Sequence, residues 1–415
     1  MATIKAFSGL RPKKENVHRI ASLPYDVITS KEARLIAADN PLSFLHIVKP
    51  EVDLQESISP YADEVYQKGK ENLNSFIRQG LLEQDSAPCL YVYQQKMRDH
   101  IQTGLMALAS IEDYQNNIIK KHELTRMEKE DDRCNHILTL MAHTGPVLMT
   151  YHQQNDIDKL IKTIISQEPE FHFIADDNIE HVFWTVHEAA VQKNLIHAFS
   201  EINAVYIADG HHRSAAAVRA AEHLRKQNTA FTGDEPYNFF MAVLFPHNQL
   251  NIIDYNRVVK DLNGLNIQTF LEKLSEKFLV REFPSSNGYR PVVKHDFGMY
   301  LDGKWYRLSG IPGTWNANSP VDHLDVSILF NNILSPILGI TDTRKDSRID
   351  FIGGSKGLSA LESMVNSGEM AVAFSLHPTG IQDLMDIADR NEIMPPKSTW
   401  FEPKLRSGLV THLLS

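Results

Sequence analysis

The strongest local signal in this sequence is Val205-Tyr206-Ile207-Ala208-Asp209-Gly210-His211-His212-Arg213-Ser214-Ala215-Ala216-Ala217. Its short apolar run predicts a buried strand, Asp-Gly predicts a turn, and the small residues after Arg213 predict a helix. A helix N-terminus carries unpaired N–H groups and the positive end of the macrodipole, so it attracts anions. An arginine at that point can bind phosphate oxygens through two donors. The stretch therefore predicts a phosphate-binding site.

Each polar residue of this turn has an expected role. Gly210 lets the backbone approach a ligand closely, while His211, His212 and Arg213 hold phosphate groups. Asp209 holds a metal ion or orients a histidine. The alternative is a plain strand-to-helix turn that Asp209 caps, with two surface histidines.

Bulk properties exclude several classes of protein. With 415 residues the chain is long enough for two or three domains, and its net charge of −10 argues against a general nucleic-acid binder. The two cysteines, Cys89 and Cys134, form neither a disulfide framework nor a zinc motif. The first residues lack a signal-peptide core, and no apolar run is long enough to span a membrane. We therefore expect a cytoplasmic protein.

The order of the expected elements indicates an α+β fold with mixed sheets and helices. Strand-like pieces are expected at 21–28 and 42–48, paired strands at 89–94 and 103–111, and a strand at 239–245. Helices are expected at about 56–82, 127–142, 156–167 and 187–200, and at 325–338 ending at Gly339. A hairpin is expected at 298–308 around Asp302-Gly303. The turn-rich stretch near 282–292 suggests a boundary between 1–282 and 283–415.

A second group of candidates lies between residues 121 and 136. His122, Glu123 and Arg126 precede an expected helix, where a loop can aim side chains at a substrate. Within that helix Asp132 and His136 are four residues apart and share a face, and Arg133 follows Asp132. The alternative for the helical part is a solvated face with charge pairs.

Three further stretches are candidates, each with a structural alternative. Asp26 follows Pro24 in a rigid loop, or is simply a turn residue. Asn256 and Arg257 follow an apolar run and could complete a metal-nucleotide site, or could start a helix. Near the C-terminus, an anion-binding loop or an extended surface segment is expected at Lys397, Ser398 and Thr399.

The box Asp209-Gly210-His211-His212-Arg213 resembles the phosphate-binding motif of free serine kinases in the ParB/sulfiredoxin-like superfamily. The whole chain is similar to a bacterial family, long catalogued only as a conserved domain of unknown function, that is associated with ATP-dependent serine kinase activity. The matching pieces are Leu23-Pro24-Tyr25-Asp26-Val27-Ile28, His122-Glu123-x-Thr125 with Asp132-Arg133, Tyr206 to Arg213, Asp325-Val326-Ser327, Leu338-Gly339-Ile340, and Met394 to Lys404. Two positions depart from the family's pattern. Leu23 stands where a second proline is commoner, and Tyr255-Asn256-Arg257 replaces a Thr-His-Arg or similar triplet.

The resemblance implies a ParB/sulfiredoxin-like nucleotide-binding core with additional α/β elaborations, the core and catalytic region being 1–282. It implies transfer of a phosphoryl group from ATP, or from ADP, to the hydroxyl of free L-serine with Mg²⁺. The nucleotide phosphates would be held by Gly210, His211, His212, Arg213, Asn256 and Arg257, and Mg²⁺ would lie near Asp209 or Asn256. The base would be Glu123 or Asp26, with Glu123 ranked first. The serine would be bound by His122, Arg126, Arg133, Lys397, Ser398 and Thr399.

Two other functions stay open from the sequence. One is a ParB-like switch that binds a nucleotide and clamps a partner, which predicts binding without turnover. The other is a phosphatase or hydrolase that uses the same phosphate site. The expected ligands are small molecules rather than nucleic acid or membrane, and the oligomeric state stays open.

Overall fold

A nine-stranded sheet organises the larger of the two units into which the chain divides. The computed structural model describes residues 1–285 and 287–415. Unit 1 comprises Met1–Lys121, Thr125–Leu250 and Pro403–Ser415, and unit 2 comprises His122–Leu124 and Asn251–Glu402. These units do not divide at the expected 282/283 boundary, because β14 (Tyr255–Val259) pairs with β18 (Ile349–Gly353) and β19 (Val372–Leu376). Ser286, in the turn-rich stretch, lies outside the described residues.

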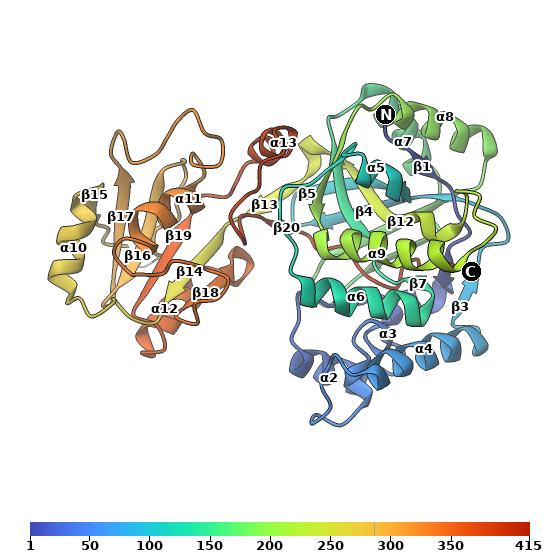
Figure 1. Ribbon diagram of the computed structural model, residues 1–415, viewed down its shortest axis with the longest axis horizontal. Helices are drawn as coiled ribbons and strands as arrows, with labels where there is room; N and C mark the ends of the chain where they lie inside the picture. The colour runs from blue at the N-terminus through green and yellow to red at the C-terminus, as the bar shows by residue number, and fades with distance from the viewer. Residues whose placement is uncertain (286) are drawn as a thin grey trace. The chain divides into compact units, whose positions relative to one another are not determined.

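The sheet of unit 1 mixes parallel and antiparallel pairs (Figure 1). Its strands are, in spatial order, β6 (Ile119–Lys120), β11 (Val205–Asp209), β8 (Val147–Tyr151), β12 (Phe239–Pro246), β5 (His100–Ser110), β4 (Leu90–Met97), β10 (Glu180–Val186) and β9 (Phe171–Ile174), with β1 (Ile4–Lys5) also paired to β5. The pairs β11–β6 and β12–β8 are parallel, and β4–β5 is the expected antiparallel pair. The observed architecture agrees with the expected α+β class.

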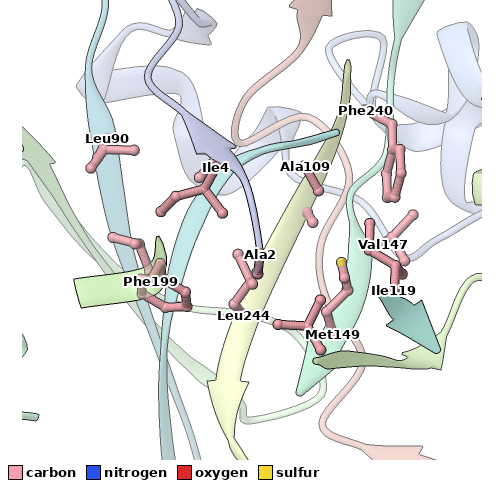
Figure 2. Close-up of a cluster of buried hydrophobic side chains, with 14 of the residues drawn as sticks. Ala2, Ile4, Leu90, Ala109, Ile119, Val147, Met149, Phe199, Phe240 and Leu244 are labelled. Carbon is pink, nitrogen blue, oxygen red and sulfur yellow. The ribbon is translucent and has the colours of Figure 1, made fainter. Parts of the chain in front are cut away.

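One face of this sheet is covered by helices and forms the main core of unit 1. Alternate strand residues point to the same face, so Leu90, Val147 and Leu244 meet in one apolar cluster, which Figure 2 shows. The covering helices are α6 (Met127–Leu140), α7 (Asn155–Ile165), α8 (Ala189–Ser200) and α9 (His211–Gln227), and α5 (Ile111–Gln115) follows β5. Small residues such as Ala216 and Ala220 let α9 pack closely on the sheet. The helices expected at 127–142, 156–167 and 187–200 are confirmed.

Residues 10–84 form a mainly helical region with a separate apolar cluster. It contains β2 (Leu10–Pro12), η1 (Lys14–Asn16), α1 (Val17–Ile20), α2 (Ser30–Asp39), α3 (Leu45–Val48), η2 (Pro50–Asp53), α4 (Asp63–Arg78) and β3 (Leu82–Gln84). The strand expected at 42–48 is wrong, since an apolar run of this length fits either a strand or a buried helix and the chain forms α3 here. At 21–28 only Ser22 makes a bridge, to Ser407. The helix expected from 56 begins at Asp63, after the Pro60 turn.

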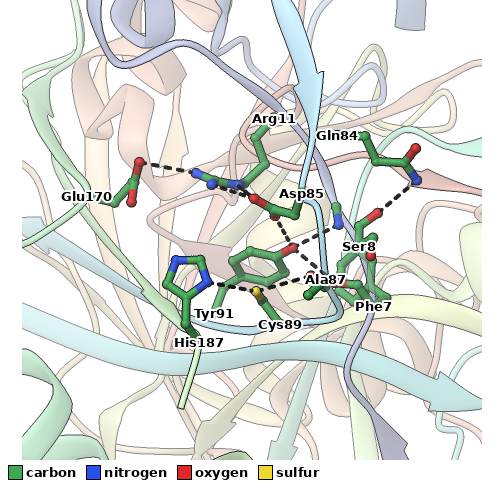
Figure 3. Close-up of polar contacts among 11 residues, drawn as sticks. Phe7, Ser8, Arg11, Gln84, Asp85, Ala87, Cys89, Tyr91, Glu170 and His187 are labelled. Atoms are coloured by element: carbon green, nitrogen blue, oxygen red, sulfur yellow. Dashed lines mark hydrogen bonds and ion pairs between the residues drawn. The ribbon is translucent and has the colours of Figure 1, made fainter. Parts of the chain in front are cut away.

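Two buried polar contacts tie the N-terminal segment of unit 1 to β4 (Figure 3). Arg11 Nη2 donates to Asp85 Oδ1 at 2.7 Å, and Tyr91 Oη donates to Asp85 Oδ2 at 2.6 Å. Cys89 Sγ lies 3.3 Å from His187 Nδ1, and burial raises the pKa of the Cys89 thiol. A thiol that burial keeps protonated is a poor nucleophile, so Cys89 is not a candidate for nucleophilic chemistry.

Unit 2 is built on a six-stranded antiparallel sheet in the order β15 (Phe278–Glu282), β17 (Lys304–Gly310), β16 (Asp296–Leu301), β19, β14 and β18. Its helices are α10 (Ile267–Ser275), α11 (Asp325–Leu329), α12 (Leu358–Asn366) and α13 (Ile381–Asp389). The hairpin around Asp302-Gly303 is confirmed as β16–β17. The helix expected at 325–338 is α-helical only in α11 and continues as a π-helix over Phe330–Leu334, before Gly339 at φ +69°.

Three short pairings complete the described structure, the first of which joins β2 to β3 in unit 1. In unit 2, β13 (Asn251–Ile253) pairs with β20 (Trp400–Glu402). In unit 1, β7 (Ala142–His143) pairs with β21 (His412–Leu413). Two short 3₁₀ segments of unit 1, η3 (Pro236–Asn238) and η4 (His247–Gln249), flank β12. In unit 2 a third, η6 (Gly354–Lys356), follows β18. Within the described ranges, the helices are all too short or too polar to cross a bilayer.

Candidate functional site

The strand–turn–helix at 205–217 forms as the sequence predicts. β11 ends at Asp209, Gly210 adopts φ +102°, and α9 begins at His211. Only glycine adopts this φ without strain, so Gly210 is what lets the chain turn directly from strand to helix. The N-cap is therefore Gly210, and the alternative in which Asp209 caps the helix is wrong.

The Arg213 side chain folds back beneath this turn. Its Nη1 donates to the Pro146 carbonyl, and its Nη2 lies 3.6 Å from Asp26 Oδ2. Its Nε is buried and makes no hydrogen bond with the described residues. Burial alone would lower the pKa of Arg213, but the charges of Asp26 and Asp209 raise it. The first turn of α9 thus holds a fixed positive charge with an unused donor.

Asp209 pairs with a lysine from the end of the chain. Lys404 Nζ donates to Asp209 Oδ2 at 3.0 Å. Burial alone would raise the pKa of Asp209, but the charges of Lys404 and Arg213 hold it well below its usual range. Asp209 is therefore ionised at neutral pH. Lys404 had been singled out only as part of a C-terminal motif, because sequence alone does not show which carboxylate it meets.

A second charged cluster joins the Asp26 loop to α6. The Arg133 guanidinium stacks 4.0 Å from the Tyr25 ring, and its Nε and Nη2 each lie 2.9 Å from Asp132 Oδ2. Tyr66 Oη donates to Asp132 Oδ1 at 3.1 Å, so this carboxylate is fully engaged. Asp132 is buried, so the solvated alternative is wrong for this face of α6. The solvated alternative is confirmed on another face of α6, where Asp131 pairs with Arg219 at 2.6 Å.

A cavity in unit 1 lies beside these arginines. Its lining residues come from the Tyr25 loop, α6, the β7–β8 segment, α9, β12 and the C-terminal segment: Pro24, Tyr25, Val48, Arg133, His136, Ile137, His143, Thr144, Gly145, Val147, Arg213, Ala217, Phe240, Met241 and Ser407. About 40 Å³ of it is open to the centres of water-sized molecules, which is room for about three waters or for a small polar fragment that replaces them. The cavity brings Arg133 and Arg213 to one place, although they are eighty residues apart. His136 belongs to the second group of candidates from the sequence, whereas His143 is not a candidate there.

The loop before α6 is tied to the start of α9. The Arg126 amide donates to His212 Nε2 at 3.1 Å, and His211 is only 5% exposed. The Arg126 backbone therefore contacts a residue of the phosphate-binding turn. The ligand-binding roles of His211, His212 and Arg126 stay predictions.

In unit 2 the structure brings two of the predicted stretches together. Arg257 Nη2 donates to the Lys397 carbonyl at 2.8 Å, and Lys397 Nζ lies 5.7 Å from the Tyr255 ring centroid. Burial lowers the pKa of Arg257 to about 10. Asn256 and Arg257 lie inside strand β14, so the helix start considered for this stretch is wrong. The aromatic Tyr255 and the β-branched Val258 and Val259 favour the strand.

The Asn256 side chain is held at both ends. Its Nδ2 donates to Asp254 Oδ2 at 2.7 Å, and its Oδ1 accepts from the Leu376 amide at 3.1 Å. Asp254 also accepts from Arg290 at 2.8 Å. To bind a metal, Asn256 would have to give up the Leu376 amide, and its metal role stays a prediction.

The remaining predicted residues also belong to unit 2. The His122 carbonyl accepts from the Met394 amide at 2.8 Å, which fixes the backbone beside Glu123. Ser398 Oγ donates to the Pro395 carbonyl at 2.6 Å. Thr399 follows it, partly exposed, before β20. The substrate roles of His122, Glu123, Ser398 and Thr399 stay predictions.

Three solved structures illustrate what the chain is similar to. A conserved hypothetical protein from Pyrococcus furiosus is 12% identical, with a TM-score of 0.33 over 73% of this chain and 93% of that one. A free serine kinase in complex with AMP is 13% identical, with a TM-score of 0.32 over 72% and 86%. SbnI from Staphylococcus aureus, truncated at its C-terminus, is 10% identical, with a TM-score of 0.37 over 74% and 86%. These TM-scores are too low to support an inference about this chain.

Among curated proteins none matches the chain. A family model described as "Protein of unknown function (DUF1015)" matches residues 4–327, which is most of the sequence. The chain therefore belongs to the DUF1015 family.

Proposed function

We propose that this protein is a small-molecule kinase, which transfers the γ-phosphoryl group of ATP to the hydroxyl of free L-serine and releases O-phosphoserine and ADP. The observation that carries the proposal is the buried Arg213 guanidinium at the first turn of α9, with an unpaired Nε and the Asp26 carboxylate 3.6 Å from its Nη2. Phosphoryl transfer needs an anion site of this kind and a carboxylate that takes the hydroxyl proton.

The phosphate site of the proposal is the start of α9. The backbone N–H groups of its first turn have no partner within the helix, and Gly210 places no side chain in front of them. His211 and His212 occupy the first helical positions, and Arg213 adds a permanent charge. In this proposal unit 1 contains the ParB/sulfiredoxin-like core that the resemblance implies.

Mg²⁺, when bound, would supply positive charge that neutralises the phosphate groups during the transfer. The described residues fit such an ion at Asp209, because its carboxylate is ionised and only Oδ2 is bonded, by Lys404. Asp209 Oδ1 makes no hydrogen bond with the described residues. Asn256 fits less well, since both ends of its amide are occupied.

The base of the proposal is Asp26 or Glu123. The geometry of unit 1 favours Asp26, because it stands beside Arg213 and follows Tyr25, which lines the cavity. Glu123 is the alternative base, because it lies in the loop between His122 and Arg126 that the sequence identifies as a candidate. For the acceptor, Arg133 is the proposed partner of the serine carboxylate, with Lys397 as the alternative.

A panel assay tests the proposal. Purified full-length protein is mixed with Mg²⁺, ATP or ADP, and L-serine, L-threonine, L-homoserine or glycerol, and phosphorylated products are separated and identified. The proposal predicts a product with L-serine and ATP. Nucleotide binding without any product would favour the switch, and phosphate release that does not depend on an acceptor would favour a hydrolase.

A further inference from the structure

The cavity of unit 1 contains polar groups that phosphate binding alone does not explain. We infer that it is the subsite for the amino-acid end of the acceptor, with the carboxylate between Arg133 and Arg213 and the ammonium group against His143. The inference rests on the proposed function for the identity of the amino acid. It goes beyond the proposed function by assigning the groups that recognise the carboxylate and the ammonium ends of the acceptor, and by naming His143 as a specificity residue.

Each of the two arginines at this cavity has an N–H group that makes no hydrogen bond with the described residues. Arg213 Nε is buried without a partner among the described residues. Both Nε and Nη2 of Arg133 contact Asp132, and Nη1 makes no hydrogen bond in the described part of the chain. A buried donor without a partner is destabilising, and a carboxylate satisfies such donors well. The Tyr25 ring stacked on Arg133 fixes the plane of the guanidinium.

In the cavity the charge balance favours a carboxylate over a phosphate; the nucleotide phosphates of the proposed function are assigned to the backbone N–H groups at the start of α9, where Arg213 contributes its charge but not its Nε donor. Arg133 is paired with Asp132 at 2.9 Å and Arg213 faces Asp26 at 3.6 Å, so the two cations are already matched by two anions. A dianion would add excess negative charge to a buried place, whereas an amino-acid zwitterion adds none. The two nearby carboxylates also favour the ammonium group of such a zwitterion.

The histidines supply uncharged acceptors. His143 is 6% exposed, and its Nδ1 is buried without a partner among the described residues. Burial, with His412 as the next cause, keeps the pKa of His143 well below its usual value. Burial, together with the charge of Arg133, lowers the pKa of His136 to about 3. A neutral imidazole keeps one lone pair that can accept from an ammonium group, which an imidazolium cannot do.

The test is calorimetric binding to the full-length protein, with and without ADP, using L-serine, 3-hydroxypropanoate, ethanolamine and inorganic phosphate. 3-Hydroxypropanoate lacks the ammonium group and ethanolamine lacks the carboxylate. We expect L-serine to bind at least about 10-fold more tightly than ethanolamine, which is the loss typical of a charged hydrogen-bond partner. Equal affinities of L-serine and ethanolamine, or tighter binding of inorganic phosphate than of L-serine when ADP is present, would overturn the inference without any variant.

Two variants locate the site. Arg133→Lys should weaken L-serine and 3-hydroxypropanoate by about 10-fold or more and leave ethanolamine unchanged. His143→Phe removes no hydrogen bond of the free protein and should weaken L-serine alone, by about 5-fold or more. Arg219→Lys, on the exposed side of α9, is the control and should bind as the wild type does.

The two claims fail separately. If these variants raise neither the dissociation constant nor the KM for serine while phosphoryl transfer proceeds, the inference is wrong and the proposed function stands. If L-serine binds and responds to both variants but no phosphoserine forms with ATP, the inference stands and the proposed function is wrong.

Discussion

The Arg213 Nη2 atom lies 3.6 Å from Asp26 Oδ2, which joins the first turn of α9 to a loop almost two hundred residues earlier in the chain. This contact brings a fixed cation and a carboxylate to one place in unit 1. A kinase needs both beside its acceptor hydroxyl, and the following predictions test what each group does.

Asp26→Asn should lower kcat by about 100-fold or more, because an amide cannot take the hydroxyl proton. Glu123→Gln separates the two candidate bases, since only loss of the true base has this effect. Asp131→Asn removes an exposed carboxylate of α6 that pairs with Arg219, and serves as the matched control. Near-normal turnover of Asp26→Asn together with a large loss of kcat in Glu123→Gln would show that Glu123, and not Asp26, is the base.

Gly210→Ala should destabilise unit 1 by about 1–3 kcal/mol, because an L-residue is strained at φ +102°. A Cβ there would also lie 3.3 Å from Arg213 Nε. Gly233→Ala is the control, because Gly233 has φ +95° with open space around it. Urea unfolding should show a larger loss of the free energy of unfolding for Gly210→Ala than for Gly233→Ala. Equal losses would show that the close approach of a Cβ to Arg213 does not affect stability.

Lys404→Met should lower the free energy of unfolding by about 1–3 kcal/mol at pH 7, since it leaves the Asp209 carboxylate without its cation. The folded pKa of Asp209 lies below its unfolded value, so its stabilisation is complete above pH about 4 and is lost as the pH falls. In the variant Asp209 protonates more readily, so the difference from wild type should be constant near neutral pH and shrink as the pH falls below about 5. A difference that does not change with pH would contradict this assignment.

Asp325→Asn should stabilise the protein at pH 8.5 and have little effect at pH 5. Burial raises the pKa of Asp325 to about 7, and its Oδ2 has no partner among the described residues. A raised carboxyl pKa means that stability is lost as the pH rises from the unfolded value of about 4 through 7. Asparagine can still accept from the His295 amide, as Oδ1 does now. Thermal unfolding at both pH values measures the effect, and a stabilisation that is equal at both would argue against it.

The strand, turn and helix around Gly210 could be predicted because their signals are local. The apolar run, the Asp-Gly turn and the small-residue helix need no distant partner. The same holds for the hairpin at Asp302-Gly303. At 42–48 the local signal was ambiguous, and packing of Phe44 and Leu45 into the N-terminal cluster decided for a helix.

The partners across the site could not be predicted, because long-range pairing decides them. Nothing near Asp209 in the sequence points to Lys404, and nothing near Arg257 points to the Lys397 carbonyl. His143 lies on the two-residue strand β7, whose pairing with β21 is visible only in the folded chain. The sequence names Arg133 and Arg213 as candidates, but the cavity that both residues line is visible only in the folded chain.

The central claim is tested most directly by ³¹P NMR of the full-length protein with ATP, Mg²⁺ and L-serine, compared with Arg213→Lys. We expect the O-phosphoserine resonance to grow as the γ-phosphate resonance of ATP declines, at a rate about 10-fold or more lower in Arg213→Lys than in the wild type. Arg219→Lys should match the wild type. Inorganic phosphate as the only product, or no change in the ATP resonances, would contradict the account.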